Sequence, residues 1–443
     1  MAKGRNLLRN GGFERSRTGE KVPASWRTWA PRGVLAPEIA LDGGVHRSGR
    51  ASLRMGSRNR SYTLGGVRQE LADLASGRCY ELTAYVRTRE VKWVQESVAL
   101  KLEWLRKDGG ALQKHFFAPE GTARGWRRVG GLVEAPQGAE RAVVELRFRW
   151  AKGGAVWWDD VSLREAPLKR HRLVTLGSVA YVPPAGSTVE QNLHDYCDRA
   201  KLAGRLGCDL VCLTEGVNGL RTGLSYVKAA EPIPGPFTEA LGAVARRYGM
   251  YLVVGLYERA GRLCYNTAVL IDRDGQLLGR YRKTHLPEAE ALGGLTPGDE
   301  HPVFQTDFGR VGIEICYDNF FPEVTRALAI NGAEVICLPI AGDGRAGHYN
   351  WDIVARARAI DNSVYFVSSI WGPRSLIIDP EGHILADSAG QDTVITARVD
   401  LDQRRFSRWL SARSAGCWNE LWPVERRPRT YGDLARDLGP PPS

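Results

Sequence analysis

The chain has 443 residues, of which 43% are apolar and 25% are charged, a balance that is ordinary for a soluble globular protein of two or three domains. Its formal net charge is +11, but the 61 Lys and Arg residues are scattered and form no basic run with interleaved aromatic residues, so nucleic acid is not an expected partner. No stretch approaches the roughly 18 apolar residues of a membrane span, so a membrane partner is not expected. The N-terminus lacks the apolar run of a signal peptide, so we expect a cytoplasmic protein.

Residues 1–168 are predicted to form an all-β sandwich. They hold 8 of the 13 tryptophans and contain short runs in which apolar and polar residues alternate, as in strands with one buried face. Three such runs lie at residues 80–86, 98–104 and 142–148. Turns that contain Gly or Pro separate these runs, which is typical of two packed antiparallel sheets. A charged segment at residues 166–172, with one proline and no periodicity, is the expected linker.

Residues 169–401 are predicted to form an α/β domain, because strands and helices alternate along this segment. An amphipathic helix is expected at residues 188–206, and a second helix at 239–248, where Gly249 ends it. Apolar strands are expected at residues 173–179, 210–213, 251–257, 266–272, 276–281, 364–368 and 375–378. The turn at Asp274 and Gly275 predicts a hairpin, which favours a mixed sheet over a purely parallel one.

The stretch from residue 309 to residue 339 reveals the clearest candidate nucleophile. It begins with an apolar strand, predicted over 311–315, that leads to Cys316, and Pro322 suits the first turn of the helix that follows. A thiol at the carboxyl end of a strand, beside a helix N-terminus, is where an α/β protein places a nucleophile. By itself a cysteine in this context is more often inert core. The eight cysteines form no CxxC pair and have no histidines at metal-ligand spacing, which argues against disulfides and zinc.

Two other strand ends carry charged residues, namely Glu215 in LTEG and Lys283 in YRKTHLPEAE. Together with Cys316 in GRVGIEICYDNFFPE, these motifs resemble the Glu, Lys and Cys motifs of the nitrilase superfamily, the carbon–nitrogen hydrolases, in type and order. The downstream segments GAEVICLP, RARAIDN and ERRPRTYGDL are similar to that family as well. The resemblance implies an αββα sandwich that assembles into homodimers or larger homo-oligomers, and it implies catalysis without a cofactor.

The resemblance also implies the chemistry. A neutral thiol needs a base when it attacks an amide carbonyl, and Glu215 would be that base for Cys316. Lys283 and the backbone N–H of Tyr317 would stabilise the oxyanion. An acyl-cysteine thioester would form, ammonia or an amine would leave, and water would release the acid. A second glutamate follows the lysine in this family, and we expect it to be Glu290, with Glu288 as the alternative.

The substrate remains open at this stage. True nitrilases tend to have Trp and Glu after the nucleophile, whereas this chain has Tyr317 and Asp318, which resembles the amidase and carbamoylase branches. We therefore predict a small amide or carbamoyl-amine substrate, with nitrile hydrolysis as the alternative. The pocket is expected to be lined by Asn319, Phe320 and Phe321, by the loop at 341–351 and by residues near Tyr257. Asp343, Arg345 and His348 make that loop polar.

The N-terminal segment resembles carbohydrate-binding modules of the jelly-roll, galactose-binding-like type. The resemblance lies in NLLRNGGFE near the start and GAVWWDDVSL near residue 160. It implies a carbohydrate ligand and a structural Ca²⁺ held by Glu14 and Asp160. The alternative is that both carboxylates accept hydrogen bonds from backbone donors. A carbohydrate-binding or scaffold protein with an inactive hydrolase domain is the alternative from another class. Residues 402–443 are predicted to be a tail that packs on another subunit.

Overall fold

The computed structural model describes residues 4–16, 22–119, 125–342, 350–370, 374–408 and 413–436. The chain divides into two compact units. The first unit joins Met1–Arg170 to Arg404–Ser443, and the second is His171–Gln403. The α/β segment is therefore inserted between two parts of one unit, and the C-terminal segment lies in the same unit as the N-terminal one. Packing of that segment on another subunit stays a prediction.

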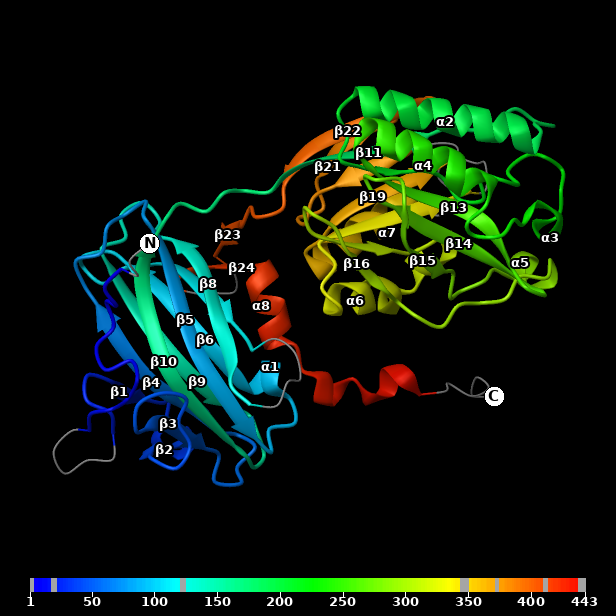
Figure 1. Ribbon diagram of the computed structural model, residues 1–443. Coiled ribbons are helices and arrows are strands. Elements are labelled where there is room, and N and C mark those ends of the chain that lie inside the picture. Colours follow the sequence, from blue (N-terminus) through cyan, green and yellow to red (C-terminus); the bar gives the residue numbers. More distant parts are fainter. Residues whose placement is uncertain are drawn as a thin grey trace. The chain divides into compact units, whose positions relative to one another are not determined.

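The first unit consists of two sheets around a single hydrophobic core (Figure 1). Among the described residues, one sheet has the order β1 (Arg27–Trp29), β4 (Leu64–Leu71), β9 (Arg141–Arg149), β6 (Val98–Leu105), β7 (Ala111–Phe117), β24 (Ala415–Cys417) and β23 (Phe406–Ser407). The other has the order β2 (Glu38–Asp42), β3 (Ser52–Gly56), β10 (Ala155–Ala166), β5 (Cys79–Arg89) and β8 (Arg127–Glu134). Trp26, Trp104 and Trp158 are fully buried in the core, so these aromatic rings fill the interior.

The C-terminal segment completes this first unit. β24 pairs in parallel with β7, and α8 (Trp418–Glu425) packs Leu421 and Val424 against Phe116. The Arg427 guanidinium lies 2.8 Å from the carboxylate of Glu96, which is buried next to α1 (Val94–Ser97). Short 3₁₀ turns occupy Gly33–Leu35, Pro428–Thr430 and Gly432–Ala435.

The second unit has two mixed sheets. Among the described residues, the first has the order β15 (Leu277–Arg282), β14 (Leu263–Ile271), β13 (Tyr251–Ala260), β12 (Leu210–Cys212), β11 (Leu173–Ala180) and β22 (Thr393–Asp400). The second has the order β16 (Val303–Gln305), β17 (Arg310–Ile313), β18 (Val335–Ile340), β19 (Tyr365–Ile370), β20 (Leu376–Ile378) and β21 (Ile384–Asp387). The β11–β12–β13 and β17–β18–β19 neighbours are parallel, and the remaining pairs are antiparallel.

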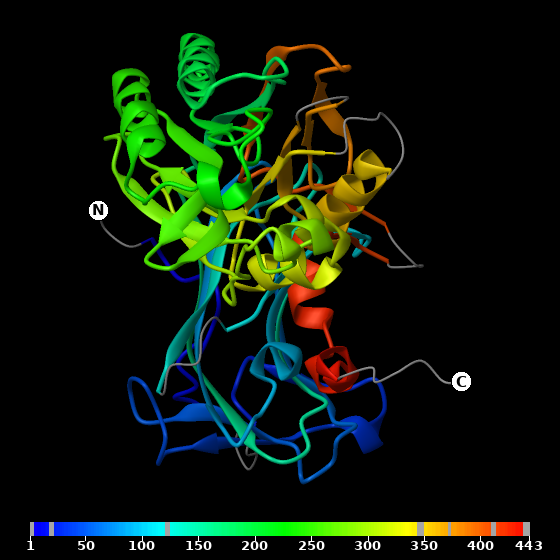
Figure 2. The same ribbon diagram turned by 90° about the vertical axis from the view of Figure 1, so that its right-hand side faces the viewer.

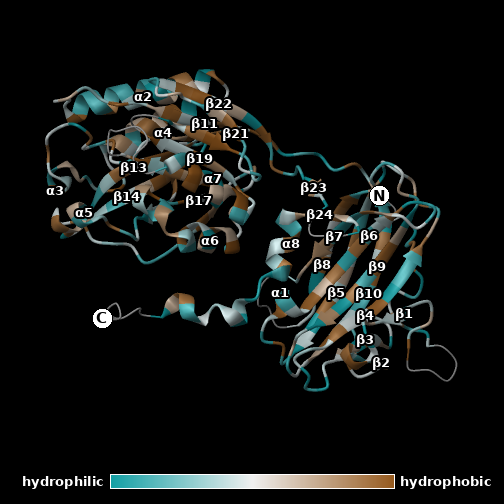
Figure 3. Ribbon diagram, turned by 180° about the vertical axis from the view of Figure 1, so that it is seen from behind, coloured by the Kyte–Doolittle hydropathy of each residue, from teal (hydrophilic) through white to brown (hydrophobic). Residues whose placement is uncertain are grey.

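Helices cover both outer faces of these sheets, which gives an αββα layering (Figures 1 and 2). α2 (Val189–Arg205) and α4 (Pro236–Tyr248) pack on the first sheet, and α6 (Pro322–Ile330) and α7 (Trp351–Asn362) pack on the second. A separate core cluster joins the inner faces of the two sheets. Figure 3 shows hydrophobic strands in the interior and a largely hydrophilic α2 outside them. The αββα fold expected from the sequence is therefore confirmed for this unit.

Local sequence explains where two of these helices begin and end. The Thr188 side chain and the Gln191 side chain cap each other's backbone N–H groups, so α2 begins directly after Thr188. Pro236 occupies the first position of α4, three residues before the predicted start. Gly249 ends α4 with φ +62°, a left-handed conformation that glycine adopts without steric cost.

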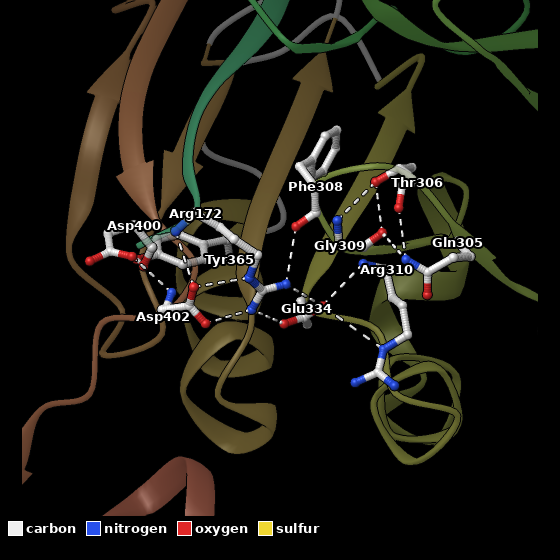
Figure 4. Close-up of polar contacts among 10 residues, drawn as sticks. All are labelled: Arg172, Gln305, Thr306, Phe308, Gly309, Arg310, Glu334, Tyr365, Asp400 and Asp402. Atoms are coloured by element: carbon white, nitrogen blue, oxygen red, sulfur yellow. Dashed lines mark hydrogen bonds and ion pairs between the residues drawn. The ribbon is translucent and has the colours of Figure 1, made fainter. Parts of the chain in front are cut away.

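Arg172 cross-links the two sheets where the chain enters and leaves the second unit (Figure 4). Its guanidinium donates to Asp402, just beyond β22, at 2.9 and 3.0 Å and to Glu334, just before β18, at 2.8 and 3.3 Å. It also donates to the carbonyl oxygen of Phe308 at 3.0 Å. The bidentate geometry suits the planar guanidinium.

In the described part of the chain, no helix is long and apolar enough to cross a membrane.

Candidate active site

Glu215, Lys283 and Cys316 come from different strands but meet at one end of the two packed sheets. Glu215 lies three residues beyond β12, and Lys283 follows directly after β15, both in the first sheet. Cys316 lies beyond β17 in the second sheet. The fourth predicted residue, Glu290, lies on α5 (Glu288–Leu292) and joins them, whereas Glu288 is exposed to solvent.

The Lys283 ammonium lies between two carboxylates and is fully buried. Its Nζ donates to Glu215 Oε1 at 2.9 Å and to Glu290 Oε1 at 2.7 Å. The Asn266 amide donates to the same two oxygens, at 2.7 and 3.2 Å. The backbone N–H of Ala341 donates to Glu215 Oε2 at 2.6 Å. The Glu215 carboxylate therefore has donors on both oxygens and is held in one orientation.

The charges of Lys283, Glu215 and Glu290 depend on one another. Burial opposes the charge of Lys283, but the negative charges around it, first that of Glu215, outweigh burial and hold the pKa of Lys283 well above its ordinary value. Lys283 is therefore a permanent cation at neutral pH. Burial, and next the charge of Glu215, raises the pKa of Glu290 to about 7. Glu290 Oε2 is buried and accepts no hydrogen bond from any described residue, so it is free to accept one from a substrate.

Cys316 occupies a strained turn. Its φ is +47°, a left-handed conformation that costs a non-glycine residue of order 1–3 kcal/mol. Burial, and next the charge of Glu215, raises the pKa of the thiol. The resting thiol is therefore neutral, so a base must take its proton when it attacks. Cys316 is the one partly exposed residue among the eight cysteines, all of which lie in the described residues.

The residues after Cys316 form a 3₁₀ turn, Cys316–Phe320, before α6 begins at Pro322. Tyr317 is 39% exposed, and its N–H has no acceptor among the described residues, so this N–H is available for an oxyanion. Phe320 packs on Trp351, with ring centroids 4.6 Å apart. Asn319 is fully buried in the turn, and its place in the pocket wall stays a prediction. Residues 343–349 of the expected polar loop lie outside the described residues.

Asn266 and Tyr226 were not predicted at this site from the sequence, whereas residues near Tyr257 were expected to line the pocket. Asn266 lies in β14, opposite Tyr257 of β13, and nothing local in the sequence distinguishes it. Tyr226 and Tyr257 have ring centroids 5.0 Å apart. A Cβ at Gly216, next to Glu215, would lie 2.8 Å from the Tyr257 hydroxyl, so this ring lies against the loop that carries the base. Only the tertiary structure brings these side chains to the site.

Glu14 and Asp160 lie on either side of one loop in the first unit. Glu14 accepts two hydrogen bonds from the N–H of Arg50, at 2.9 and 3.1 Å. Asp160 forms an ion pair with Arg47 and accepts a hydrogen bond from the Ser48 hydroxyl at 2.6 Å. These carboxylates already have donors, and one donor is a cation that would repel Ca²⁺. The arrangement does not fit the predicted calcium site, and no calcium-dependent role is derived.

We expect Glu290→Gln to lower kcat/KM about 10- to 100-fold at pH 8, because a hydrogen bond to an ionised group contributes about 1.5–3 kcal/mol. In the wild type, kcat/KM should rise with pH through about 7 as Glu290 ionises. The variant should lose this rise, since the glutamine does not titrate. Initial rates measured from pH 5 to pH 9 test this. If kcat/KM of the variant rises with pH as it does in the wild type, the group that titrates is not Glu290.

A second prediction concerns Glu314, which is fully buried two residues before Cys316 and accepts a hydrogen bond from Thr325 at 2.6 Å. Burial raises its pKa from 4.5 to about 8. The folded state then holds a proton that the unfolded state releases above about pH 4.5. The stability of the wild type should therefore fall by about 1.4 kcal/mol per pH unit between these values through this group. Glu314→Gln should remove this slope, which denaturant melts at pH 5, 6.5 and 8 would measure. If the free energy of unfolding falls equally with pH in the wild type and in Glu314→Gln, Glu314 does not cause this fall and the prediction is wrong.

Comparisons with known proteins match the second unit. Residues 176–408 match the family model described as carbon-nitrogen hydrolase. The omega-amidase NIT2 of Xenopus tropicalis is 34% identical over 233 residues, which cover 48% of this chain and 84% of that protein. The human omega-amidase NIT2 is 32% identical over 236 residues, covering 48% and 85%. The crystal structure of Saccharomyces cerevisiae Nit3, a nitrilase superfamily member, aligns with a TM-score of 0.48 and 26% identity, covering 52% of this chain and 90% of that one.

Proposed function

The chain belongs to the carbon–nitrogen hydrolase family, and from that premise we propose that it is an amidase that hydrolyses the terminal amide of a small molecule and releases ammonia. The observation that supports this is the buried Lys283 ammonium between Glu215 and Glu290, together with the Cys316 thiol, whose pKa is raised by burial and by the charge of Glu215. The terminal amide is chosen because the relatives that match over most of their length are omega-amidases.

In the proposed acylation step, Glu215 takes the thiol proton while Cys316 Sγ attacks the amide carbon. The carbonyl oxygen becomes an oxyanion that faces Lys283 Nζ and the Tyr317 N–H, and each such donor is worth about 3–4 kcal/mol in the transition state. Glu215 then gives its proton to the amide nitrogen, the C–N bond breaks, and ammonia leaves. An acyl thioester remains on Cys316.

In the proposed deacylation step, Glu215 takes a proton from water, whose oxygen attacks the thioester carbon. The C–S bond breaks, the acid is released, and the thiolate of Cys316 regains a proton. Glu290 Oε2, which has no described donor, would accept a hydrogen bond from the amide N–H₂ and orient the scissile bond. Tyr226 and Tyr257 would form the wall beside the base. No cofactor enters either step.

The test is ammonia release from three substrate classes: amides (propionamide, succinamate), a carbamoyl-amine (N-carbamoyl-β-alanine) and nitriles (propionitrile, benzonitrile). Release from amides alone is expected. Glu215→Gln, which keeps Cys316 but removes the base, should lower the rate about 10²- to 10⁴-fold. Preferential hydrolysis of the nitriles or the carbamoyl-amine would replace the proposed substrate class. No release from any class would favour a scaffold with an inactive hydrolase unit.

We also propose that the protein forms a homodimer or larger homo-oligomer through α6 and α7. Three isoleucines on these helices are exposed: Ile330 (47%), Ile353 (59%) and Ile360 (41%). A second copy would cover them. Light scattering should give at least twice the monomer mass for the wild type and the monomer mass for Ile353→Asp. A monomeric wild type would contradict the proposal.

For the first unit we propose a carbohydrate-binding role with a jelly-roll arrangement, on the resemblance of its sequence to such modules. Two largely antiparallel sheets around one core are consistent with that role. Binding of the full chain to a panel of immobilised glycans is the test. Binding that an excess of succinamate does not displace would place the ligand outside the candidate active site, and no binding to any glycan would argue against the role.

A further inference from the structure

Asp318 is a buried carboxylate that accepts an unusual number of hydrogen bonds. Its side chain is fully buried. Oδ2 accepts from the Tyr281 hydroxyl at 2.7 Å and from the Ile315 N–H at 3.1 Å. Oδ1 accepts from the Thr284 hydroxyl at 3.0 Å and from the His285 N–H at 2.9 Å, and His285 Nδ1 lies 3.0 Å from it. Only an ionised carboxylate can accept this many donors.

These donors come from two segments, the one that contains Lys283 and the one that leads to Cys316. Three of them belong to residues 281–285, the segment that contains Lys283 and extends from β15 of the first sheet. The fourth is Ile315, the residue before Cys316, which follows β17 of the second sheet. Asp318 is thus a polar link between the two sheets at the place where the nucleophile and the cation must meet.

Contacts with Asp318 hold both the Cys316 turn and the Lys283 segment in place. Cys316 has a left-handed backbone, which persists only when its surroundings impose it. The Ile315 N–H immediately before it is directed to Asp318, and this bond anchors the turn. On the other side, Tyr281 is almost fully buried, and His285 lies flat on Phe321, with ring centroids 3.8 Å apart. The Lys283 segment is therefore held on both flanks by a single carboxylate.

We propose that Asp318 is a positioning residue, which sets the distance between the Lys283 ammonium and the Cys316 thiol by holding the two segments together. It touches neither the substrate nor the reacting atoms in this role. A misplacement of about 1 Å can cost about 100-fold in rate. The loss of Asp318 should therefore slow the chemical step far more than it weakens substrate binding.

The first test variant is Asp318→Asn, which keeps the size of the side chain. Its amide nitrogen cannot accept, so at least two of the donors lose their partner. The substrate-independent readout is alkylation of Cys316 by iodoacetamide, followed by mass spectrometry from pH 6 to pH 9. We expect a rate about tenfold lower at pH 7.5 and a steeper rise with pH, because the thiol is no longer aligned with Glu215.

The second readout rests on the proposed function and uses ammonia release from succinamate. We expect kcat to fall about 100-fold while KM changes less than threefold. Asp402→Asn is the matched control, because Asp402 is also a buried carboxylate that links the sheets, but through Arg172 (Figure 4). It should lower Tm and leave the alkylation rate and kcat unchanged.

If Asp318→Asn does not fold, Tyr281→Phe and Thr284→Val each remove one donor and should each lower the alkylation rate of the folded protein. Normal alkylation and a normal kcat in the folded Asp318→Asn protein, with only a lower Tm, would overturn the proposal. Normal alkylation rates in both Tyr281→Phe and Thr284→Val would also overturn it. Wild-type protein that is alkylated at Cys316 but inert on every amide would overturn the proposed function and leave the alkylation test of Asp318 valid.

Discussion

Replacing Cys316 by alanine is expected to lower kcat for amide hydrolysis by about 10⁶-fold, the size of loss seen when an activated nucleophile is removed. The acyl bond can no longer form, whereas Lys283, Glu215 and Glu290 keep their places. Substrate binding should therefore change little, which calorimetry of the variant with the amide would show. Cys316 is also the one cysteine of the eight that is not buried, so iodoacetamide should no longer add one group per folded chain.

Cys337→Ala is the matched control, since Cys337 is a fully buried thiol in β18 of the same sheet. It should lose some thermal stability, because its side chain packs in the core between the sheets, but it should keep its kcat and its alkylation at Cys316. Residual activity of Cys316→Ala within tenfold of the wild type would rule out a cysteine mechanism. Loss of activity in both variants would point to misfolding.

Replacing Lys283 by methionine is expected to lower kcat/KM by at least about 10³-fold. One oxyanion donor alone accounts for about 10²- to 10³-fold. The substitution also leaves the carboxylates of Glu215 and Glu290 buried together without a cation, and like charges raise the pKa of one of them. The pair of carboxyl groups then keeps a proton at neutral pH, so the variant should regain part of its activity as the pH rises to about 9.

The stability of this variant should also fall, by about 3–5 kcal/mol, because the cation of a buried ion pair is removed. Denaturant melts at pH 7 would measure this change. Lys201→Met is the matched control, because Lys201 forms an ion pair with Asp198 on the surface of α2 and should affect neither stability nor rate appreciably. A Lys283→Met enzyme with a normal pH profile would show that Lys283 does not control the protonation of Glu215.

Local patterns in the sequence were sufficient for much of the fold. The Thr188 cap, the Gly249 stop and the Asp274-Gly275 turn each depend on a few neighbouring residues, and the structure places an element boundary at each. Strand β17 ends at Ile313, earlier than the apolar run suggested, because the Ile315 N–H turns to the side chain of Asp318. Apolar character alone could not reveal that competition.

The family and the types of the reacting groups could be predicted from the amino-acid sequence. A cysteine, a lysine and a glutamate, each after an apolar strand, were visible as motifs in order along the chain. Their surroundings could be found only in the folded chain: Asn266 on both carboxylates, Asp318 between the two sheets, and the return of the C-terminal segment to the N-terminal unit. These contacts join residues far apart in the chain. Their energies come from burial and charge at the site, which no local stretch of sequence specifies.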